Sequence, residues 1–298
     1  AMDLPEEPQA FFYGKVFGGG DVHIYGDEMD CKIDVNARTN ANTDFYLNVY
    51  STTQATTSNF INFVQPDTTS RHLLNLLKPK TDIAKINAPQ SRFQLTIHGE
   101  ATPDAKVTIK MGEDRIYGQG EGNLKLVYES PSEDVQMQGT YTLHSGLYHF
   151  TLGNIVRRNF LVKEGGKITW DSDPMAPKVD LTGYYATSGS LRDLFGSESN
   201  QVATNRTKVP VNCLIHMTED LFNPNLAFSI ELPQSDESVQ SQVNSIINTD
   251  EMLMRQVIYL LVFDRFYTPD YLQNTQNVGL NETYSILSST ITGQINSW

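Results

Sequence analysis

The sequence predicts a mainly β protein: a long antiparallel meander, curled into a taco-like trough or a sandwich with an apolar interior, with helical segments toward the C-terminus. Three observations lead to this prediction. Apolar and polar residues alternate with a period of two through most of residues 11–232, as in strands that have one dry face. The connections between the central segments are too short for the crossovers that parallel strands need. Helical periodicity begins only after Leu232-Pro233.

The clearest alternation lies in residues 135–185. From Val135 to Leu143 every second residue is apolar or Gly, and the residues between them are Gln or Thr. We expect His144-Ser145-Gly146 to form a tight connection, after which residues 147–152 make the second strand of a hairpin. Three further short strands follow before residue 185. The segment is therefore expected to be antiparallel and amphipathic throughout.

Strands are also expected on both sides of Gly18-Gly19-Gly20. We interpret these glycines as a hairpin joint, because glycine tolerates the positive φ of tight turns. Alternating segments follow at Cys31–Ala37 and Phe45–Val49, and a polar turn over Thr39–Thr43 separates them.

Long stretches rich in Thr, Ser, Asn and Pro interrupt this pattern at residues 51–59 and 65–88, and we expect both to be loops. A short helix is expected near residues 72–77. The alternation resumes over residues 93–126, with a turn at Gly118–Gly122.

A third polar loop is expected at residues 188–205, and strands at 209–217 and 226–232 complete the β part. The first helix is expected to have Ser235 as its N-cap.

A second helix is expected to begin at Thr249-Asp250-Glu251 and to end by Thr268-Pro269, and a third to cover residues 284–295. The chain stops at Trp298 within this third helix, so we expect it to be a piece of a longer protein.

These elements predict one domain in three parts. Residues 1–10 are a lead-in that starts with Ala1-Met2, interpreted as a remnant of cloning. Residues 11–232 form the curled β-domain, and residues 233–298 form its helical C-terminal segment.

The composition disfavours several functions. The 35 acidic residues against 22 basic ones give a net charge of −13, which repels nucleic acid and anionic membrane surfaces. No segment has the run of roughly 18 to 20 apolar residues that a membrane-spanning helix needs. Cys31 and Cys213 both lie on the apolar phase of expected strands, so we expect buried free thiols rather than a disulfide.

We find no motif that indicates catalysis, a cofactor or a metal site. The glycines of Gly118–Gly122 are not followed by a helix that would hold a phosphate. The pair Asp171 and Asp173 is more typical of a corner than of a metal site. His144 and His149 are an odd number of residues apart, so they are expected on opposite faces of a sheet. The chain is therefore expected not to be an enzyme.

The strands carry many apolar residues on one face, yet few helices are available to cover it. Such a sheet must pair with a second sheet, close into a barrel or curl lengthwise into a trough. In a filled sandwich the apolar residues are core, whereas in an open trough they bind an apolar guest. The alternation alone favours the filled sandwich.

Four consecutive segments carry a resemblance to a known family. They begin at Gly139 (GTYTL), Gly146 (GLYHF), Phe160 (FLVKEGGKITW) and Pro177 (PKVDLTGYY). In this order and spacing they resemble the C-terminal domain of the TamB family. The similarity extends over residues 11–298, where Val211–Ile215, Asn225–Ile230 and the helical segment after Leu232-Pro233 also occur in the family's order.

The resemblance implies a fold and a role. TamB-like proteins of Gram-negative bacteria are anchored in the inner membrane and cross the periplasm as a long β-structure, and their C-terminal domain is a curled sheet with an apolar interior. They act in outer-membrane protein assembly with a barrel partner of the TamA type, and in carrying phospholipid along a hydrophobic groove. This chain would be the periplasmic C-terminal part, without the anchor.

On this hypothesis the apolar phase of the strands lines a groove that shields acyl chains from water. Burial of one methylene group contributes about 0.8 kcal/mol. The candidate groove residues are Phe93, Leu95, Ile97, Val107, Ile109, Leu124, Leu126, Val135, Met137, Tyr141, Tyr148, Phe150, Trp170, Val179, Leu181, Val211, Phe228 and Ile230. The same positions would be core in a filled sandwich. Glutamate at Leu126 or Met137 separates the two cases, because an unpaired charge in a filled core would unfold the protein.

Two other functions stay open. One is a chaperone that offers a free sheet edge to nascent barrel strands and binds little lipid. The other is an extracellular glycan-binding β-domain or polysaccharide lyase, which needs exposed aromatic residues beside paired carboxylates. Tyr184-Tyr185 near Asp180 and Asp193 is the best candidate for such a cluster, and it is a poor one.

Overall fold

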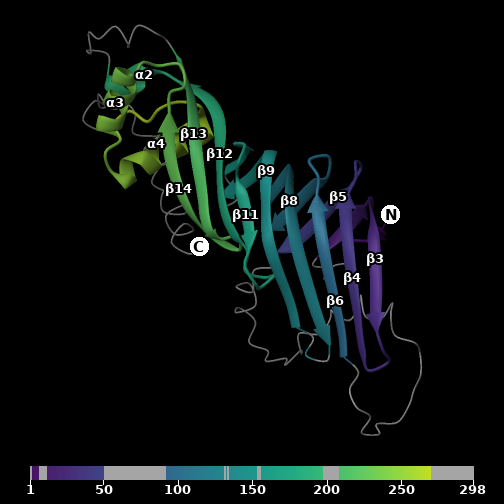
Figure 1. Ribbon diagram of the computed structural model, residues 1–298. Coiled ribbons are helices and arrows are strands. Elements are labelled where there is room, and N and C mark those ends of the chain that lie inside the picture. Colours follow the sequence, from purple (N-terminus) through teal and green to yellow (C-terminus); the bar gives the residue numbers. More distant parts are fainter. Residues whose placement is uncertain are drawn as a thin grey trace. The chain divides into compact units, whose positions relative to one another are not determined.

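A computed structural model of the chain describes residues 2–6, 12–49, 92–130, 132, 134–152, 156–196 and 208–269. Within these residues it has 14 strands and three helices, which confirms the predicted mainly β fold (Figure 1). The strands are β1 (Met2–Leu4), β2 (Phe12–Val16), β3 (Gly18–Gly26), β4 (Asp30–Thr39), β5 (Asp44–Val49), β6 (Arg92–Ala101), β7 (Lys106–Met111), β8 (Asp114–Ser130), β9 (Asp134–Leu152), β10 (Val156–Val162), β11 (Lys167–Trp170), β12 (Lys178–Gly189), β13 (Val209–Asp220) and β14 (Asn223–Glu231). The helices are α2 (Leu191–Phe195), α3 (Glu237–Ile246) and α4 (Asp250–Phe263).

All 14 strands belong to one mixed sheet. Its main path is β1-β2-β5-β7-β8-β9-β10-β12-β13-β14. Beside this path, β6 pairs with β8, β4 with β6, and β3 with β4, while β11 pairs with β9 and β12. The loops expected at 51–59 and 65–88, with the short helix near 72–77, and the helix expected at 284–295 lie outside the described residues.

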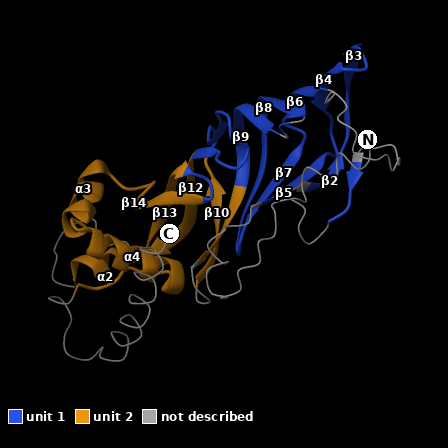
Figure 2. Cartoon of the chain, turned by 90° about the horizontal axis from the view of Figure 1, so that it is seen from below, with its two compact units in different colours: residues 1–146, 164–179, 220–222 blue, residues 147–163, 180–219, 223–298 orange. Residues whose placement is uncertain are grey.

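The chain divides into two compact units (Figure 2). Unit 1 contains residues 1–146, 164–179 and 220–222, and unit 2 contains residues 147–163, 180–219 and 223–298. Helix α4 packs against β14 and β10 of unit 2. The helices therefore share a unit with strands that precede residue 232.

The strands of unit 1 form two groups of paired strands, named here the long wall and the short wall. A continuous stretch of chain that bends once, named here a ribbon, contributes one part to each wall. The long wall contains β3, β4, β6 and residues 122–130 of β8, and the short wall contains β1, β2, β5, β7 and residues 114–119 of β8. Four ribbons pass from one wall to the other: β2–β3, β4–β5, β6–β7 and β8 itself. Figure 2 shows β3, β4 and β6 in one layer and β2, β5 and β7 in another. Both layers include part of β8, which pairs with β6 in the long wall and with β7 in the short wall.

Threonine hydroxyls tie the ribbons together at the corners where they bend. Phe17 is the corner between β2 and β3, and its N–H donates to Thr43 Oγ1 at 3.0 Å. The Thr43 hydroxyl in turn donates to the Phe17 carbonyl at 2.9 Å. At the next corner the Thr102 N–H donates to Thr39 Oγ1 at 2.9 Å, and the Thr102 hydroxyl donates to the Thr39 carbonyl at 3.0 Å. The polar residues expected to form a turn thus satisfy the backbone at a bend.

The corner of β8 uses glycine instead. A Cβ atom at Gly120 would lie 2.1 Å from the Thr142 carbonyl oxygen of β9, and one at Gly139 would lie 2.1 Å from the Asn123 carbonyl oxygen. Gly139 also has a φ of 134°. The two strands approach so closely that only glycine fits at these positions.

The structure corrects three expected turns. Gly118–Gly122 lies inside β8, and His144-Ser145-Gly146 lies inside β9, so neither forms a hairpin. Gly18-Gly19-Gly20 begins β3 rather than joining a hairpin. The reversal between β3 and β4 lies at Asp27–Met29, where Asp27 Oδ1 accepts hydrogen bonds from the N–H groups of Met29 and Asp30. Glycine bends these long strands without reversing them.

The sheet was expected to be antiparallel, but it also contains parallel pairs. β4 pairs with β6 in parallel, and β5 pairs with β7 in parallel, whereas β2–β5, β3–β4, β6–β8 and β7–β8 are antiparallel. Residues 50–91 separate each pair of parallel strands in the sequence. Parallel strands need a long connection between them, and these pairs are far enough apart in the sequence to have one.

Unit 2 has a filled core. Tyr148, Phe150 and Phe160 are buried and pack edge to face or tilted, with ring centroids 5.7 to 6.4 Å apart. On β13 the alternate residues Val211, Cys213, Ile215 and Met217 are all fully buried. Both cysteines are free thiols, as expected. Cys213 is buried as expected, whereas Cys31 is only half-buried.

The helices of unit 2 begin close to the expected positions. Asp236, not Ser235, is the N-cap of α3. Thr249 is the N-cap of α4, where its hydroxyl accepts a hydrogen bond from the Met252 N–H. Helix α4 ends earlier than expected, at Phe263, because Asp264 adopts the left-handed conformation. Within the expected loop 188–205, α2 buries Leu191 and Leu194.

Candidate functional site: an open apolar face

Four strands of the long wall place their apolar residues in register on one face. Val22 of β3 pairs with Val35 of β4, Val35 with Ile97 of β6, and Ile97 with Leu126 of β8. Directly paired residues point to the same side of a sheet. The neighbouring rows repeat this arrangement. The set, named here the apolar face, consists of Val22, Ile24, Cys31, Ile33, Val35, Phe93, Leu95, Ile97, Leu124, Leu126 and Tyr128.

This face is not covered like a core. Tyr128 is the only buried member, with 8% of its surface exposed. The residues on β4 and β6, together with Leu124 and Leu126, are half-buried, and Val22 and Ile24 at the edge are 59% and 68% exposed. In unit 2, by contrast, the alternate residues Val211, Cys213, Ile215 and Met217 of β13 are fully buried. The long wall therefore presents a continuous apolar surface that a guest can reach.

The opposite face of the same wall is polar. Asp21, Asn36, His98 and Lys125 form one row, and the Asn36 amide donates to Asp21 at 2.9 Å. In the row beside it, Arg38 forms an ion pair with Glu100 at 3.3 Å. A hydrogen bond to Asp34 raises the pKa of Tyr25 above its usual value. The two faces thus differ sharply in polarity.

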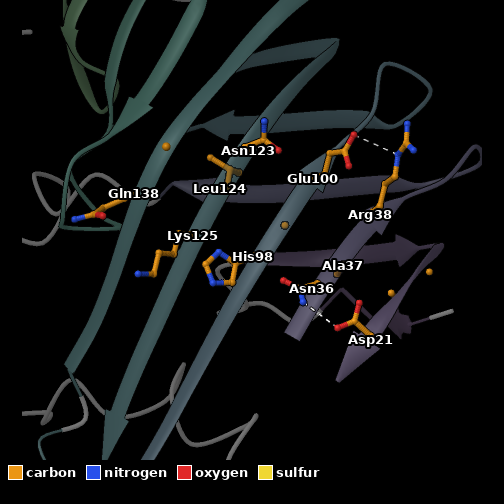
Figure 3. Close-up of a pocket in the computed structure, with 14 residues that line it drawn as sticks. Asp21, Asn36, Ala37, Arg38, His98, Glu100, Asn123, Leu124, Lys125 and Gln138 are labelled. Carbon is orange, nitrogen blue, oxygen red and sulfur yellow. Dashed lines mark hydrogen bonds and ion pairs between the residues drawn. The ribbon is translucent and has the colours of Figure 1, made fainter. Parts of the chain in front are cut away.

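A shallow hollow of about 510 Å³ lies over these polar rows. Figure 3 shows its labelled side chains, with Lys125, His98, Asn36 and Asp21 across one row and Asn123, Glu100 and Arg38 across the next. Acidic and basic groups alternate there and in part neutralise each other, so the hollow favours neither anions nor cations. Gln138 of β9 lines it as well.

The structure separates the predicted groove residues into two sets of nine. The half-buried set comprises Phe93, Leu95, Ile97, Val107, Leu124, Leu126, Val135, Met137 and Phe228. The buried set comprises Ile109, Tyr141, Tyr148, Phe150, Trp170, Val179, Leu181, Val211 and Ile230. Five of the half-buried residues lie together on the apolar face: Phe93, Leu95, Ile97, Leu124 and Leu126.

The remaining predicted residues lie elsewhere. Val107 and Ile109 are on β7 of the short wall, and Val135, Met137 and Tyr141 are on β9. Burial raises the pKa of Tyr141 to about 12. Tyr148, Phe150, Leu181, Val211, Phe228 and Ile230 belong to unit 2.

Sequence reasoning missed the part of the apolar face that β3 and β4 supply. The alternation of Cys31, Ile33 and Val35 marked a strand, but nothing local indicated that it pairs with β6. The signal was present in the matching alternation of Phe93, Leu95 and Ile97, which has the same spacing.

Comparison with known proteins now adds to this geometry. Residues 6–297 match the description of a family of known proteins, the TamB C-terminal domain. The chain belongs to the TamB family. This is a family of cell-envelope proteins, and the match covers nearly the whole TamB-like chain, including both units. A search of curated proteins finds no match.

Two further observations concern the described part of the TamB-like chain. None of its helices there has both the length and the apolar character needed to cross a membrane. The same residues contain no cluster of three or more His, Cys, Asp or Glu side chains suited to a metal ion.

Proposed function

We propose that this chain is the periplasmic part of a TamB-like protein anchored in the inner membrane of a Gram-negative bacterium, and that its apolar face carries phospholipid between the inner and outer membranes. The observation that carries the proposal is the row structure of the long wall. Apolar residues from four strands lie in register on one face, and all but Tyr128 remain at least partly accessible.

The dimensions of this face suit an acyl chain. The rows from Phe93 to Gly99 span six residue steps, or about 20 Å at roughly 3.3 Å per residue. One leaflet of a bilayer has a hydrocarbon thickness of about 15 Å, half of roughly 30 Å. An acyl chain laid along the strands would therefore be shielded over its whole length on one side.

The energetics allow movement along the wall. Each methylene removed from water contributes about 0.8 kcal/mol. Because successive rows carry similar aliphatic side chains, an acyl chain that slides by one row exchanges one apolar contact for another. The polar head group would remain in water at the rim of the face.

Membership of the TamB family also supports a role in outer-membrane protein assembly, with a barrel protein of the TamA type as partner. We propose this role together with lipid transport. Co-purification of the chain with such a barrel from detergent-solubilised envelopes tests it, and failure to co-purify under conditions that retain the chain would contradict it.

The decisive experiment on lipid is native mass spectrometry of the purified chain after incubation with phospholipid vesicles. We expect near-stoichiometric phospholipid on the wild-type chain. Leu126→Glu places an unpaired charge in the apolar face and should remove the lipid, because burying that charge under acyl chains costs several kcal/mol, of order 5. The variant should remain folded, since Leu126 is only half-buried.

Asn123→Glu is the matched control. Asn123 lies on the same strand and is exposed on the polar face. Its replacement by glutamate changes the net charge by the same amount as Leu126→Glu. It should retain lipid. A wild-type chain that stays free of lipid, or equal loss of lipid in both variants, would contradict the proposal.

A further inference from the structure

The hollow on the polar face of the long wall lies over strands that have neighbours on both sides. β4, β6 and β8 each pair with a strand on either side. Most polar side chains of the hollow come from these three strands and from β9: Asn36, Arg38, His98, Glu100, Asn123, Lys125 and Gln138. The hollow is therefore a feature of the sheet face and does not depend on an open sheet edge.

Four of these side chains offer hydrogen bonds that the protein itself does not use. His98, Asn123, Lys125 and Gln138 are exposed, and within the described part of the chain none of the four side chains has a hydrogen-bond or ion-pair partner. The asparagine and glutamine amides each present donors and an acceptor, and a neutral histidine presents one of each. The hollow can therefore both donate to and accept from one ligand.

The charged groups of the hollow balance one another. Arg38 forms an ion pair with Glu100 at 3.3 Å. Lys125 and Asp21 add one charge of each sign, so the lining is neutral overall, whereas the whole chain carries −13. Among the described residues that line the hollow there is no Phe, Tyr or Trp on which a nucleic-acid base would stack. These properties favour an uncharged ligand that binds through many hydrogen bonds.

We propose that this hollow is a binding site for a neutral oligosaccharide. Each sugar hydroxyl both donates and accepts hydrogen bonds, which matches what the amide side chains and His98 offer. Hydrogen bonds from sugar hydroxyls to Glu100, and from Lys125 to sugar oxygens, involve a charged partner and are therefore stronger than bonds between neutral groups. Because all these side chains also bond water, we expect weak binding.

The length of the hollow favours several sugar rings over one. From β4 across β6 and β8 to β9 there are three inter-strand spacings, about 14 Å at roughly 4.8 Å each. One sugar ring is too short to reach the side chains at both ends. The site belongs to unit 1, whereas Tyr184-Tyr185, the region that the sequence suggested for glycan binding, belongs to unit 2.

This site is separate from lipid carriage. His98 follows Ile97 in β6, and Lys125 precedes Leu126 in β8, and adjacent residues of a strand point to opposite faces of the sheet. Leu126→Glu should therefore remove lipid and leave oligosaccharide binding unchanged. Failure of either proposal would leave the other intact, because each ligand is measured without the other.

The test is a titration of the 298-residue chain followed by saturation-transfer NMR, which detects weakly bound ligands. Maltohexaose and chitohexaose are the neutral probes, since one carries only hydroxyl groups and the other also carries acetamido groups. The chitosan hexamer has the same backbone as chitohexaose but is cationic. We expect at least one neutral hexamer to bind, and we expect any binding of the chitosan hexamer to be independent of the hollow.

Gln138→Ala and Gln136→Ala test the location. Both glutamines are exposed on the same face of β9 and lose the same amide, but only Gln138 lines the hollow. Gln138→Ala should weaken binding of the neutral hexamer about threefold to tenfold, whereas Gln136→Ala should leave it unchanged. His98→Ala should weaken binding by a similar factor, and the variant should fold because His98 is exposed.

Three results would overturn the proposal. If neither neutral hexamer binds the folded chain, the hollow is only a solvated part of the sheet face. Equal effects of Gln138→Ala and Gln136→Ala would place the binding elsewhere. Binding of the chitosan hexamer that is tighter than that of chitohexaose, and that Gln138→Ala weakens, would assign the hollow to cations.

Discussion

Val35 is the direct partner of Ile97 in the parallel pair of β4 and β6, and Ile97 is the direct partner of Leu126 in β8. The three side chains come from three ribbons and lie in one row. All three are half-buried. This row joins distant parts of the chain into one accessible apolar surface. Truncating one of its side chains should therefore lower the free energy of unfolding by a different amount than truncating a core side chain.

Leu126→Ala and Ile215→Ala compare the two environments. Ile215 is fully buried in unit 2, so its truncation should lower the free energy of unfolding by about 2–5 kcal/mol. Leu126→Ala should cost less, about 1 kcal/mol, because Leu126 is only half-buried and its truncation removes less buried apolar surface. Urea unfolding of both variants measures the difference. Equal costs would show that the apolar face is packed as tightly as the core.

Gly120→Ala should destabilise unit 1. The new methyl group would lie 2.1 Å from the Thr142 carbonyl oxygen, and forcing the strands apart should cost about 1–3 kcal/mol. At Gly19 an added Cβ meets nothing within 4 Å, so Gly19→Ala should be neutral or slightly stabilising. Thermal unfolding followed by circular dichroism gives both values. A neutral Gly120→Ala would rule out the close approach of β8 and β9.

Thr43→Val tests the corner between the walls. Valine has nearly the same shape but no hydroxyl, so the Phe17 N–H would lose its acceptor. The Phe17 carbonyl would lose one of its two donors and keep the Asn40 N–H. The expected loss is about 1–3 kcal/mol in urea unfolding. Thr43→Ser retains the hydroxyl and should recover most of that loss. If serine is as destabilising as valine, the methyl group rather than the hydroxyl stabilises the corner.

The protein should lose stability at high pH. Burial raises the pKa of the Cys213 thiol from 9.0 to about 12, and that of Tyr141 from 10.0 to about 12. Between the unfolded and folded values, the native state holds a proton that the unfolded state has released. This contribution is complete below pH 9 and is lost as the pH rises to about 12.

Urea midpoints measured from pH 8 to 11 should therefore fall. Cys213→Ala should reduce the slope between pH 9 and 10, the range in which the unfolded thiol titrates before the unfolded tyrosine. An unchanged slope in this variant would mean that Cys213 does not contribute. Alkylation followed by mass spectrometry gives a second check, since Cys31 should react faster than Cys213.

Local alternation was sufficient to predict much of the fold. It placed β4, β5, β13 and β14 correctly, and the capping pattern at Thr249 placed the start of α4. Glycine was ambiguous, since Gly118–Gly122 was expected to turn the chain and instead bends a single strand. The parallel pairing of β4 with β6 joins strands that are far apart in the sequence, and no local pattern encodes it.

The same limit applies to the candidate site. Leu126 and Val211 both lie on the apolar phase of a strand, yet one is half-buried and the other fully buried. Period-2 alternation reports which face is dry, and it is identical for an open wall and a filled core. Exposure depends on what the rest of the chain places over that face, so it required the three-dimensional arrangement.

The four corners have a mechanical consequence. Every ribbon between β2 and β8 passes through both walls, and neighbouring corners are bonded through Thr43 and Thr39. A change of backbone angle at one bonded corner would strain the hydrogen bonds to its neighbour. One corner alone therefore cannot change the spacing between the two walls. Three of the four corners are bonded in this way. These three should therefore move together, and we expect the spacing between the two walls to be rigid.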